Sequence, residues 1–331
     1  MKVRLRDIAE ATGYSVNTVS HALRDLPDIS VATKERIREA ARRLDYIPDL
    51  QAGSFKSGKR GIIAVILPDI VNPHFTLLFH EIESYFQKKG ITSLFMNTGE
   101  CCREEMNSVR VALGQNVDGV ILCPAVGSES CRLLERSGIP YVLVGRYLGI
   151  GEDAVVTDDE QGGYLATRHL IGCGHKRIAC VRACEEISSD RERFAGYRRA
   201  LGEEGIAEDP DMILHLTLRA GSNAEAISDF LTKHPDCRAI FAFSDLLATE
   251  ILAVAARMGK RVPEEITIVG YDRIADAHPM PFPLTTVGTD GESMGLAAAK
   301  LLAERMAEPR TGAGKRILLP VKLETGETRK G

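Results

Sequence analysis

Asn17, Ser20 and His21, near the amino terminus, have the side-chain types and spacing needed to hydrogen-bond another molecule. Val16, Asn17, Ser20 and His21 share the outward face of a predicted helix, and Ser15 before them has the chemistry of its N-cap. This face is polar and its side chains are short. The pattern is typical of the second helix of a DNA-binding helix-turn-helix.

A candidate nucleophile lies near the carboxyl terminus. Residues 291–295, GESMG, match the G-x-S-x-G pattern of serine hydrolases, and a Thr-Thr-Val strand precedes them. That pattern requires the serine on a tight turn directly after a strand and a histidine further along the chain, whereas the last histidine here is His278. A serine hydrolase acting through Ser293 is therefore a minor alternative, and we expect no catalytic residues.

The eight cysteines do not have the spacing of a metal or redox site. They form no C-x-x-C pair and no Cys/His ligand set, so we interpret them as small core residues in a reducing compartment. A vicinal redox pair at Cys101 and Cys102, or soft-metal binding by Cys180 and Cys184, is the alternative. We predict no metal and no cofactor.

Three short helices must position the polar face. The first ends at Gly13, the second begins after Ser15, and the third is capped by Ser30 and ends before Pro48. Their spacing assigns each helix one inward face. The inward residues are Leu5, Ile8, Ala9 and Thr12 in the first helix, Val19, Ala22 and Leu23 in the second, and Ile37, Ala40, Ala41 and Leu44 in the third.

The charge of the chain is divided unevenly. Residues 1–60 contain 12 of the 42 Lys and Arg but only 8 of the 46 Asp and Glu, a net charge of +4, so the remaining residues carry −8. Attraction to DNA phosphates depends on the charge within about 10 Å. The local excess favours nucleic-acid binding, although a solvated helix face is the simpler explanation of charge alone.

After residue 60 the pattern changes to alternating strands and helices. The apolar run 61–67 predicts a strand buried on both faces of a parallel sheet. Two such series imply two doubly wound sheets, with a ligand cleft at the carboxyl ends of their strands. Strands are expected at 61–67, 91–96, 119–123, 140–144, 177–182, 238–243, 266–270 and 284–287, and helices at 74–89, 103–115, 128–137, 160–171, 190–203, 223–233, 245–258 and 290–306.

Membrane and secretion signals are not predicted. No stretch approaches the roughly 18 apolar residues of a membrane span. Residues 1–10 alternate charged and apolar side chains and lack the apolar run of a secretory signal. We therefore expect a cytoplasmic protein that does not contact a membrane.

Segments along nearly the whole chain occur in the order specific to one family. They are 6–9 (RDIA), Gly13, 15–23 (SVNTVSHAL), 33–37 (TKERI), 44–48 (LDYIP), 72–75 (NPHF), 117–122 (VDGVIL), 169–175 (HLIGCGH), 193–197 (RFAGY), 270–272 (GYD) and 283–287 (PLTTV). In these segments the chain resembles the lactose-repressor (LacI/GalR) family of bacterial transcriptional regulators. The resemblance implies a repressor-like homodimer that binds a pseudo-palindromic operator and a small-molecule effector.

The resemblance also implies which headpiece residues contact DNA. Base edges would be faced by Val16, Asn17 and His21, with Ser20 on the same surface, and phosphates would be held by Ser15 and Thr18. Asn17 can pair with adenine through two hydrogen bonds, and Val16 can touch a thymine methyl group or simply pack. His21 stands where relatives often have arginine, so a guanine contact is not implied there.

Within the hinge at residues 49–60, the resemblance places a helix that forms only on DNA at residues 49–56. Ala52 matches the family pattern, Gly53 replaces a polar residue, and Phe55 stands where a leucine usually wedges into the minor groove. Phenylalanine is also a known wedge, so Ala52 and Phe55 are predicted DNA contacts. The alternative is that this segment, rich in Gly, Ser and Lys, is only a flexible linker.

In the body, the resemblance implies a periplasmic-binding-protein-like cleft. Its predicted effector-binding residues are His74, Phe75, Arg146, Arg193, Ser244, Asp245 and Asp272. Arginine and aspartate on opposite lobes suit a hydroxylated or charged metabolite, because each can form bidentate hydrogen bonds. Sugar sites usually stack the ring on an aromatic side chain, and this chain has no Trp, so an acid or a polyol competes with a sugar. The alternative role of Arg193 is a surface ion pair.

The predicted domains are an all-α helix-turn-helix headpiece at 1–48, a hinge at 49–60 and an α/β effector-binding and dimerisation body at 61–331. The N-subdomain would span about 61–157 plus 289–318, and the C-subdomain about 158–288 plus 319–331. The tail after Leu323 has no leucine heptad, which favours a dimer over a tail-bundled tetramer. The predicted function is metabolite-controlled transcriptional regulation, most simply repression; the alternative is a metabolite-binding protein with weak DNA binding.

Overall fold

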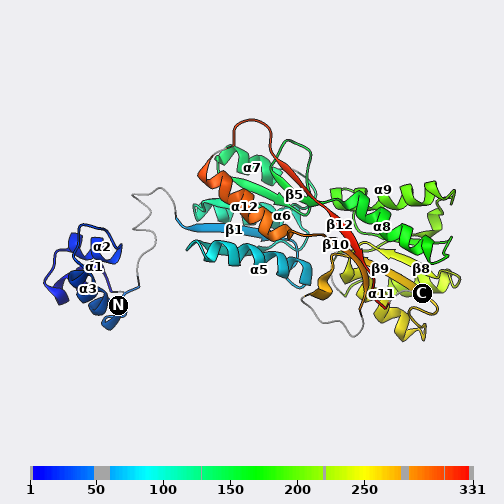
Figure 1. Ribbon diagram of the computed structural model, residues 1–331, viewed down its shortest axis with the longest axis horizontal. Helices are drawn as coiled ribbons and strands as arrows, with labels where there is room; N and C mark the ends of the chain where they lie inside the picture. The colour runs from blue at the N-terminus through cyan, green and yellow to red at the C-terminus, as the bar shows by residue number, and fades with distance from the viewer. Residues whose placement is uncertain are drawn as a thin grey trace. The chain divides into compact units, whose positions relative to one another are not determined.

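The computed structural model describes residues 3–47, 60–127, 129–218, 221–276, 283–308 and 310–327. The chain divides into two compact units, residues 1–60 and residues 61–331, which we call the headpiece and the body (Figure 1). No helix in these described ranges is long and apolar enough to cross a membrane.

Three helices form the headpiece, as predicted: α1 (Leu5–Thr12), α2 (Val16–Leu23) and α3 (Val31–Arg43). Gly13 ends α1 with a φ of 76°, a left-handed conformation that glycine adopts without steric cost. Ser15 and Ser30 cap the next two helices, because each hydroxyl accepts a hydrogen bond from the backbone N–H three residues later. The core between the helices consists of Ile8, Ala9, Val19, Ala22, Ile37, Ala40 and Ala41.

The first sheet of the body has the order β2-β1-β3-β4-β5-β11, and all its strands are parallel. Helices α5 (Pro73–Gln87) and α12 (Met294–Ala307) cover one face, and α6 (Cys102–Gly114) and α7 (Glu129–Ser137) cover the other. We call this assembly the first lobe. Its strands are β1 (Ile62–Leu67), β2 (Thr92–Asn97), β3 (Gly119–Leu122), β4 (Tyr141–Val144), β5 (Ala154–Thr157) and β11 (Arg316–Leu319).

The second lobe repeats this arrangement with the strand order β7-β6-β8-β9-β10-β12, in which only β12 is antiparallel to its neighbour. Helices α10 (Ala224–Lys233) and α11 (Asp245–Arg257) cover one face, and α8 (Asp159–Gly172) and α9 (Ser188–Glu203) the other. The short helices are η1 (Pro210–Met212) and η2 (Ile274–Asp276). The strands are β6 (Ala179–Arg182), β7 (Ile213–His215), β8 (Ala239–Ala242), β9 (Thr267–Tyr271), β10 (Thr285–Thr289) and β12 (Val321–Glu324).

The predicted pair of doubly wound sheets is therefore confirmed, but four strands were not predicted from the sequence. These strands, β5, β7, β11 and β12, contain only three or four residues each. Strands β7, β11 and β12 lie at sheet edges, where most of their side chains are exposed or only partly buried. The equally short strands β3, β4 and β8 were predicted because they are central and fully buried, which the three edge strands are not.

The chain passes between the lobes three times. It leaves β5 for α8, returns from β10 to α12, and crosses again at Pro320 from β11 to β12, drawn in red in Figure 1. Backbone hydrogen bonds connect these crossings: Asp158 N–H donates to Leu319 O at 2.9 Å, and Asp290 N–H donates to Pro320 O at 2.8 Å. The lobes are thus joined by three adjacent connecting segments, which lie directly beside the ends of β5 and β10.

Two glycines bring α8 and α9 into backbone contact. A β-carbon at Gly163 would overlap the carbonyl oxygen of Arg193, and one at Gly196 would overlap that of Glu160. Only glycine permits so close an approach. This packing places Arg193, on α9, beside the amino-terminal end of α8, where Asp159 lies.

Candidate functional site

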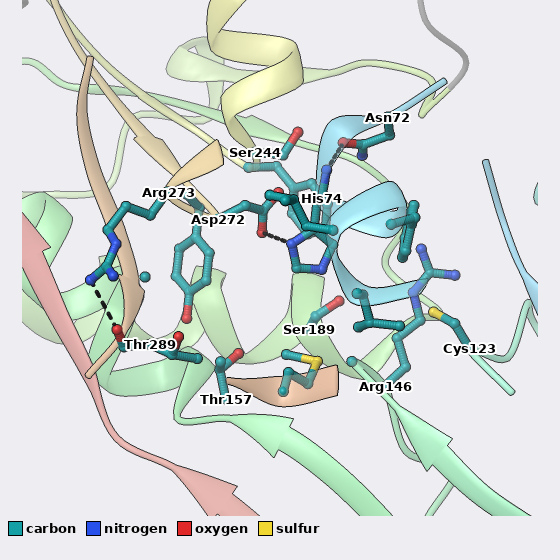
Figure 2. Close-up of a pocket in the computed structure, with 18 of the residues that line it drawn as sticks. Asn72, His74, Cys123, Arg146, Thr157, Ser189, Ser244, Asp272, Arg273 and Thr289 are labelled. Atoms are coloured by element: carbon teal, nitrogen blue, oxygen red, sulfur yellow. Dashed lines mark hydrogen bonds and ion pairs between the residues drawn. The ribbon is translucent and has the colours of Figure 1, made fainter. Parts of the chain in front are cut away.

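A cavity of about 310 Å³ lies between the lobes, lined by residues that follow the carboxyl ends of parallel strands. Asn72 and His74 follow β1, Arg146 follows β4, and Ser244 and Asp272 follow β8 and β9 (Figure 2). The volume is at the lower end of the 300–1,000 Å³ usual for small-molecule sites. Of the seven residues predicted for this cleft, six line it: His74, Phe75, Arg146, Arg193, Ser244 and Asp272.

Arg193 lines the cavity as a buried residue, so it does not form a surface ion pair. Its Nε donates to Asp159 Oδ1 at 2.8 Å and its Nη1 donates to Phe243 O at 2.6 Å. The guanidinium lies 3.5 Å from the centre of the Tyr271 ring, and its Nη2 is 3.8 Å from Asp272 Oδ1. Burial opposes the charge, but the nearby carboxylates outweigh it and raise the pKa of Arg193 above its ordinary value.

Asp272 holds a carboxylate in the same cavity from a strained position. Asp272 directly follows β9, and its φ of 108° is unusual for a residue with a side chain. Figure 2 shows His74 pointing toward it, with Nδ1 at 3.8 Å from Asp272 Oδ1. Burial raises the pKa of Asp272, against the lowering effects of His74 and Arg193. The three side chains together offer both donors and an acceptor to a bound molecule.

Arg146 lines the cavity from the first lobe and forms an ion pair with Glu100. Its Nη1 and Nη2 each donate to one carboxylate oxygen of Glu100 at 2.7 Å, and Nη1 also donates to Pro124 O at 3.0 Å. Glu100 lines the cavity but was missed by the sequence analysis. The pair is separated by 46 residues, so no local pattern in the sequence indicated it.

Asp245 does not line the cavity, in contrast to the sequence-based expectation. It is the first residue of α11 and is fully buried. Its carboxyl group accepts hydrogen bonds from Ile274 N at 2.9 Å and from the Thr286 hydroxyl at 2.6 Å. Asp245 therefore holds the loop that follows Asp272 through the backbone of Ile274. Burial, reinforced by the charge of Asp272, raises the pKa of Asp245 to about 8.

Further lining residues were not predicted from the sequence. Ser189, near the start of α9, and Thr157, at the end of β5, are buried beside the cavity, and Asn72 caps α5 by accepting from His74 N at 3.1 Å (Figure 2). Their positions at strand ends and helix starts are the signal that could have found them. Each contributes a hydroxyl or amide suited to hydroxylated ligands.

Ser293 also borders the cavity, but its role is a helix cap. Its hydroxyl accepts a hydrogen bond from Leu296 N at 3.4 Å, and α12 begins at the next residue. The helix expected at 290–306 thus starts later than predicted, and Ser293 occupies the N-cap position rather than the elbow of a hydrolase.

Several cysteines are core residues in the structure. Cys123, Cys131, Cys180 and Cys237 are buried, and burial raises the pKa of Cys123 and of Cys131 to about 12. Such thiols stay protonated and unreactive. Cys180 lies on strand β6 and Cys184 in the segment after it, so they do not share a helix face.

The predicted DNA-reading face of the headpiece is open to solvent. Val16 is 44% exposed, and Ser15 and Asn17 are also exposed, whereas Thr18, Ser20 and His21 are partly buried. Ser15 accepts from Thr18 N at 3.1 Å, and the hydroxyls of these two residues lie 2.8 Å apart. This arrangement starts α2 at the surface, which is how a recognition helix presents its first turn. Ala52 and Phe55 lie outside the described residues.

Comparisons with known proteins agree with this architecture. Residues 4–49 match the model of bacterial regulatory proteins of the lacI family, and residues 167–329 match a periplasmic binding protein-like domain. The HTH-type transcriptional repressor PurR of Aliivibrio salmonicida (strain LFI1238) is 30% identical over 311 residues, which cover 92% of each chain.

Solved structures extend the agreement to the whole fold. The transcriptional regulator CelR in complex with cellobiose is 28% identical with a TM-score of 0.72, covering 99% of this chain and 100% of that one. The lac repressor dimer bound to operator and the anti-inducer ONPF has a TM-score of 0.84 over 99% of both chains; at 23% identity it shows the fold alone. This chain therefore belongs to the LacI family of bacterial regulatory proteins and is a DNA-binding transcriptional regulator rather than an enzyme.

Proposed function

We propose that the protein is a cytoplasmic, homodimeric repressor whose affinity for a pseudo-palindromic operator is controlled by a neutral, polyhydroxylated molecule of the sugar class bound between the lobes. The cytoplasm is the compartment that holds the DNA. A dimer is proposed because one helix-turn-helix reads a single half-site, and two-fold related half-sites require two headpieces. The repressor relative from Aliivibrio salmonicida supports the direction of regulation.

The charges that line the cavity favour a neutral ligand over an acidic one. The lining includes three arginines, Arg146, Arg193 and Arg273, and four carboxylates, Asp69, Glu81, Glu100 and Asp272. Arg146 and Arg193 already form ion pairs with Glu100 and Asp159. An acidic ligand would therefore meet no excess of positive charge. A hydroxyl group can instead accept from Arg193 and donate to Asp272 at once.

The cellobiose complex of CelR, a relative of 28% identity along the whole chain, supports a carbohydrate. Leu218 and Phe243 line the cavity together with Tyr271, so aromatic and apolar surface is present although the chain has no Trp. The Arg193 guanidinium covers the Tyr271 ring at 3.5 Å and the Phe243 ring at 4.5 Å, so we assign Phe75, the remaining phenyl ring of the lining, to a sugar face.

The ligand proposal is tested by a thermal-shift and calorimetry panel of matched pairs: neutral sugars, the corresponding sugar acids and the corresponding sugar phosphates. The proposal expects stabilisation by a neutral member of a pair and weaker or no binding of its acid and phosphate. A ligand at 100 times its Kd should add about 2.7 kcal/mol of apparent stability. Stabilisation by an acid or a phosphate with no effect of its neutral partner would contradict the proposal.

On the DNA side, we propose that Val16, Asn17 and His21 face bases, with Ser20 on the same surface, and that Ser15 and Thr18 hold phosphates. We also propose that residues 49–56 form a helix on the operator, in which Ala52 contacts the DNA and Phe55 wedges into the minor groove. The test uses an operator selected by the full-length protein from random DNA. Asn17→Ala should weaken binding to this operator by about 1–3 kcal/mol and leave binding to random DNA nearly unchanged. Equal losses on both would exclude Asn17 as a base reader.

A further inference from the structure

The ring of His21 is held by an acidic side chain from the loop that follows α2. His21 Nδ1 lies 2.5 Å from Asp28 Oδ2, and the His21 side chain is 22% exposed. No second hydrogen-bond partner of the ring is found within residues 3–47. One ring nitrogen is therefore engaged inside the headpiece, and Nε2 is left to an outside partner.

The loop itself explains why Asp28 stays beside His21. Leu26 N–H donates to His21 O at 3.1 Å, and Asp25 N–H donates to Ala22 O at 3.2 Å, so the chain turns back at the end of α2. The Asp25 carboxylate then binds Arg38 at 2.7 Å and Lys34 at 3.0 Å, both on α3. The loop thus has two acids with different partners: Asp25 holds it to α3, and Asp28 holds His21.

The chemistry of the pair decides which nitrogen carries the proton. An ionised carboxylate only accepts hydrogen bonds, so His21 Nδ1 must be the donor. The hydrogen bond to His21 is the main cause that lowers the pKa of Asp28, which keeps this carboxylate ionised. In a neutral ring with Nδ1 protonated, Nε2 has a free lone pair and can only accept.

Bases differ in what they present to such an acceptor. In the major groove, adenine N6 and cytosine N4 carry amino groups that donate, whereas guanine and thymine present acceptors. We propose that Asp28 fixes the His21 ring so that Nε2 accepts a hydrogen bond from the amino group of an adenine or cytosine in the operator. Asp28 is then a positioning residue for base selection. The inference rests on the proposed DNA-reading role of α2.

The test is a base-substitution binding assay with full-length protein at one mildly alkaline pH, since the acceptor role of Nε2 requires a neutral ring. An operator is first selected from random DNA by the wild-type protein. The base pair contacted by His21 is the one at which His21→Ala loses discrimination. At that position the wild type should prefer adenine or cytosine over guanine and thymine on one strand by about tenfold.

Three variants separate positioning from a structural role. Asp28→Ala should lose most of this discrimination and keep discrimination at the other operator positions, because the ring can then rotate and change tautomer. The double variant His21→Ala/Asp28→Ala should behave as His21→Ala alone, which shows that Asp28 acts through His21. Asp25→Asn, which changes the other acid of the loop, should retain wild-type base preference.

Several results would overturn the inference. They are a wild-type preference for guanine or thymine at the contacted position, full discrimination by Asp28→Ala, no position at which His21→Ala alters discrimination, and a further change caused by Asp28→Ala when His21 is already alanine. Circular dichroism of each variant checks that the helices are retained. Failure of the wild type to select any sequence is a different result, because it would remove the proposed operator-binding function itself.

Discussion

The hydroxyl of Tyr147 donates a hydrogen bond of 2.5 Å to Glu192 Oε1 and joins the first lobe to α9 of the second lobe. A second contact lies beside it, in which Tyr147 N–H donates to the Ser188 hydroxyl at 3.0 Å. The guanidinium of Arg316, at the start of β11, covers the Tyr147 ring at 4.4 Å. Because Glu192 precedes Arg193 on α9, the helix that carries the cavity arginine is held directly to the opposite lobe.

Tyr147→Phe should therefore weaken the contact between the lobes. The change removes one hydrogen bond to a half-buried carboxylate, which corresponds to about 1–3 kcal/mol in the free energy of unfolding. Urea denaturation measures this loss, and calorimetry should show a changed ligand Kd. The matched control is Tyr164→Phe, since Tyr164 donates to Glu203 at 2.7 Å within the second lobe and on its surface. Equal effects of both changes would mean that the contact between lobes has no special role.

Arg193→Ala should destabilise the body in addition to abolishing ligand binding. The sequence analysis assigns Arg193 to ligand binding, but in the structure Arg193 also neutralises the buried Asp159. Removing one partner of a buried ion pair typically costs about 3–5 kcal/mol. The control is Arg191→Ala, an exposed residue of the same helix. Wild-type urea stability of Arg193→Ala would contradict the assigned ion pair.

Asp272→Asn should separate ligand binding from stability. Asparagine has the same shape and tolerates the positive φ of this position, and it removes a negative charge close to Asp245. Stability should be unchanged or higher, while ligand affinity falls about tenfold or more because a charge-assisted hydrogen bond is lost. Asp290→Asn, a surface change beside Lys322, is the control. Retained ligand affinity in Asp272→Asn, measured by calorimetry, would remove Asp272 from the binding site.

Asp245 should make the stability of the body depend on pH. Its pKa is raised from 3.8 to about 8, so the folded state favours the protonated acid. The resulting stabilisation is complete below 3.8 and is lost as the pH rises through about 8. Asp245→Asn mimics the protonated acid, because its oxygen can accept from Ile274 N while its amide donates to the Thr286 hydroxyl.

The measurement is the free energy of unfolding of wild type and Asp245→Asn in urea between pH 4 and pH 8.5. The advantage of the variant over wild type should grow with pH across this interval and then level off. A difference between the two proteins that stays constant over the interval would show that Asp245 is ionised throughout and that its burial is compensated.

Long apolar runs and helix caps made the main elements predictable from sequence. Strand β1 is a continuous apolar run because both its faces are covered, and Ser15 and Ser30 mark helix starts through a local hydrogen bond. By contrast, β11 and β12 owe their pairing to partners far along the chain. Local patterns contain no information on such pairings.

The same distinction holds for the site. Strand ends locate His74, Arg146 and Asp272 near the cavity, because the carboxyl ends of parallel strands meet there. Ser244 lines the cavity, whereas the carboxyl group of the next residue, Asp245, binds Ile274 N outside it. The sequence does not show in which direction each of two adjacent side chains points. The ion pair between Glu100 and Arg146 joins residues 46 positions apart, so local sequence patterns did not indicate it either.

A ligand bound between the lobes is proposed to control operator affinity. The decisive measurement is the Kd of the full-length protein for its selected operator, at one fixed salt concentration, with and without a saturating neutral sugar identified by the thermal-shift panel. The operator Kd of wild type should change about 5–150-fold, and that of Asp272→Asn should change much less at the same sugar concentration. An operator Kd that is the same with and without a sugar shown by calorimetry to be bound would contradict this proposal.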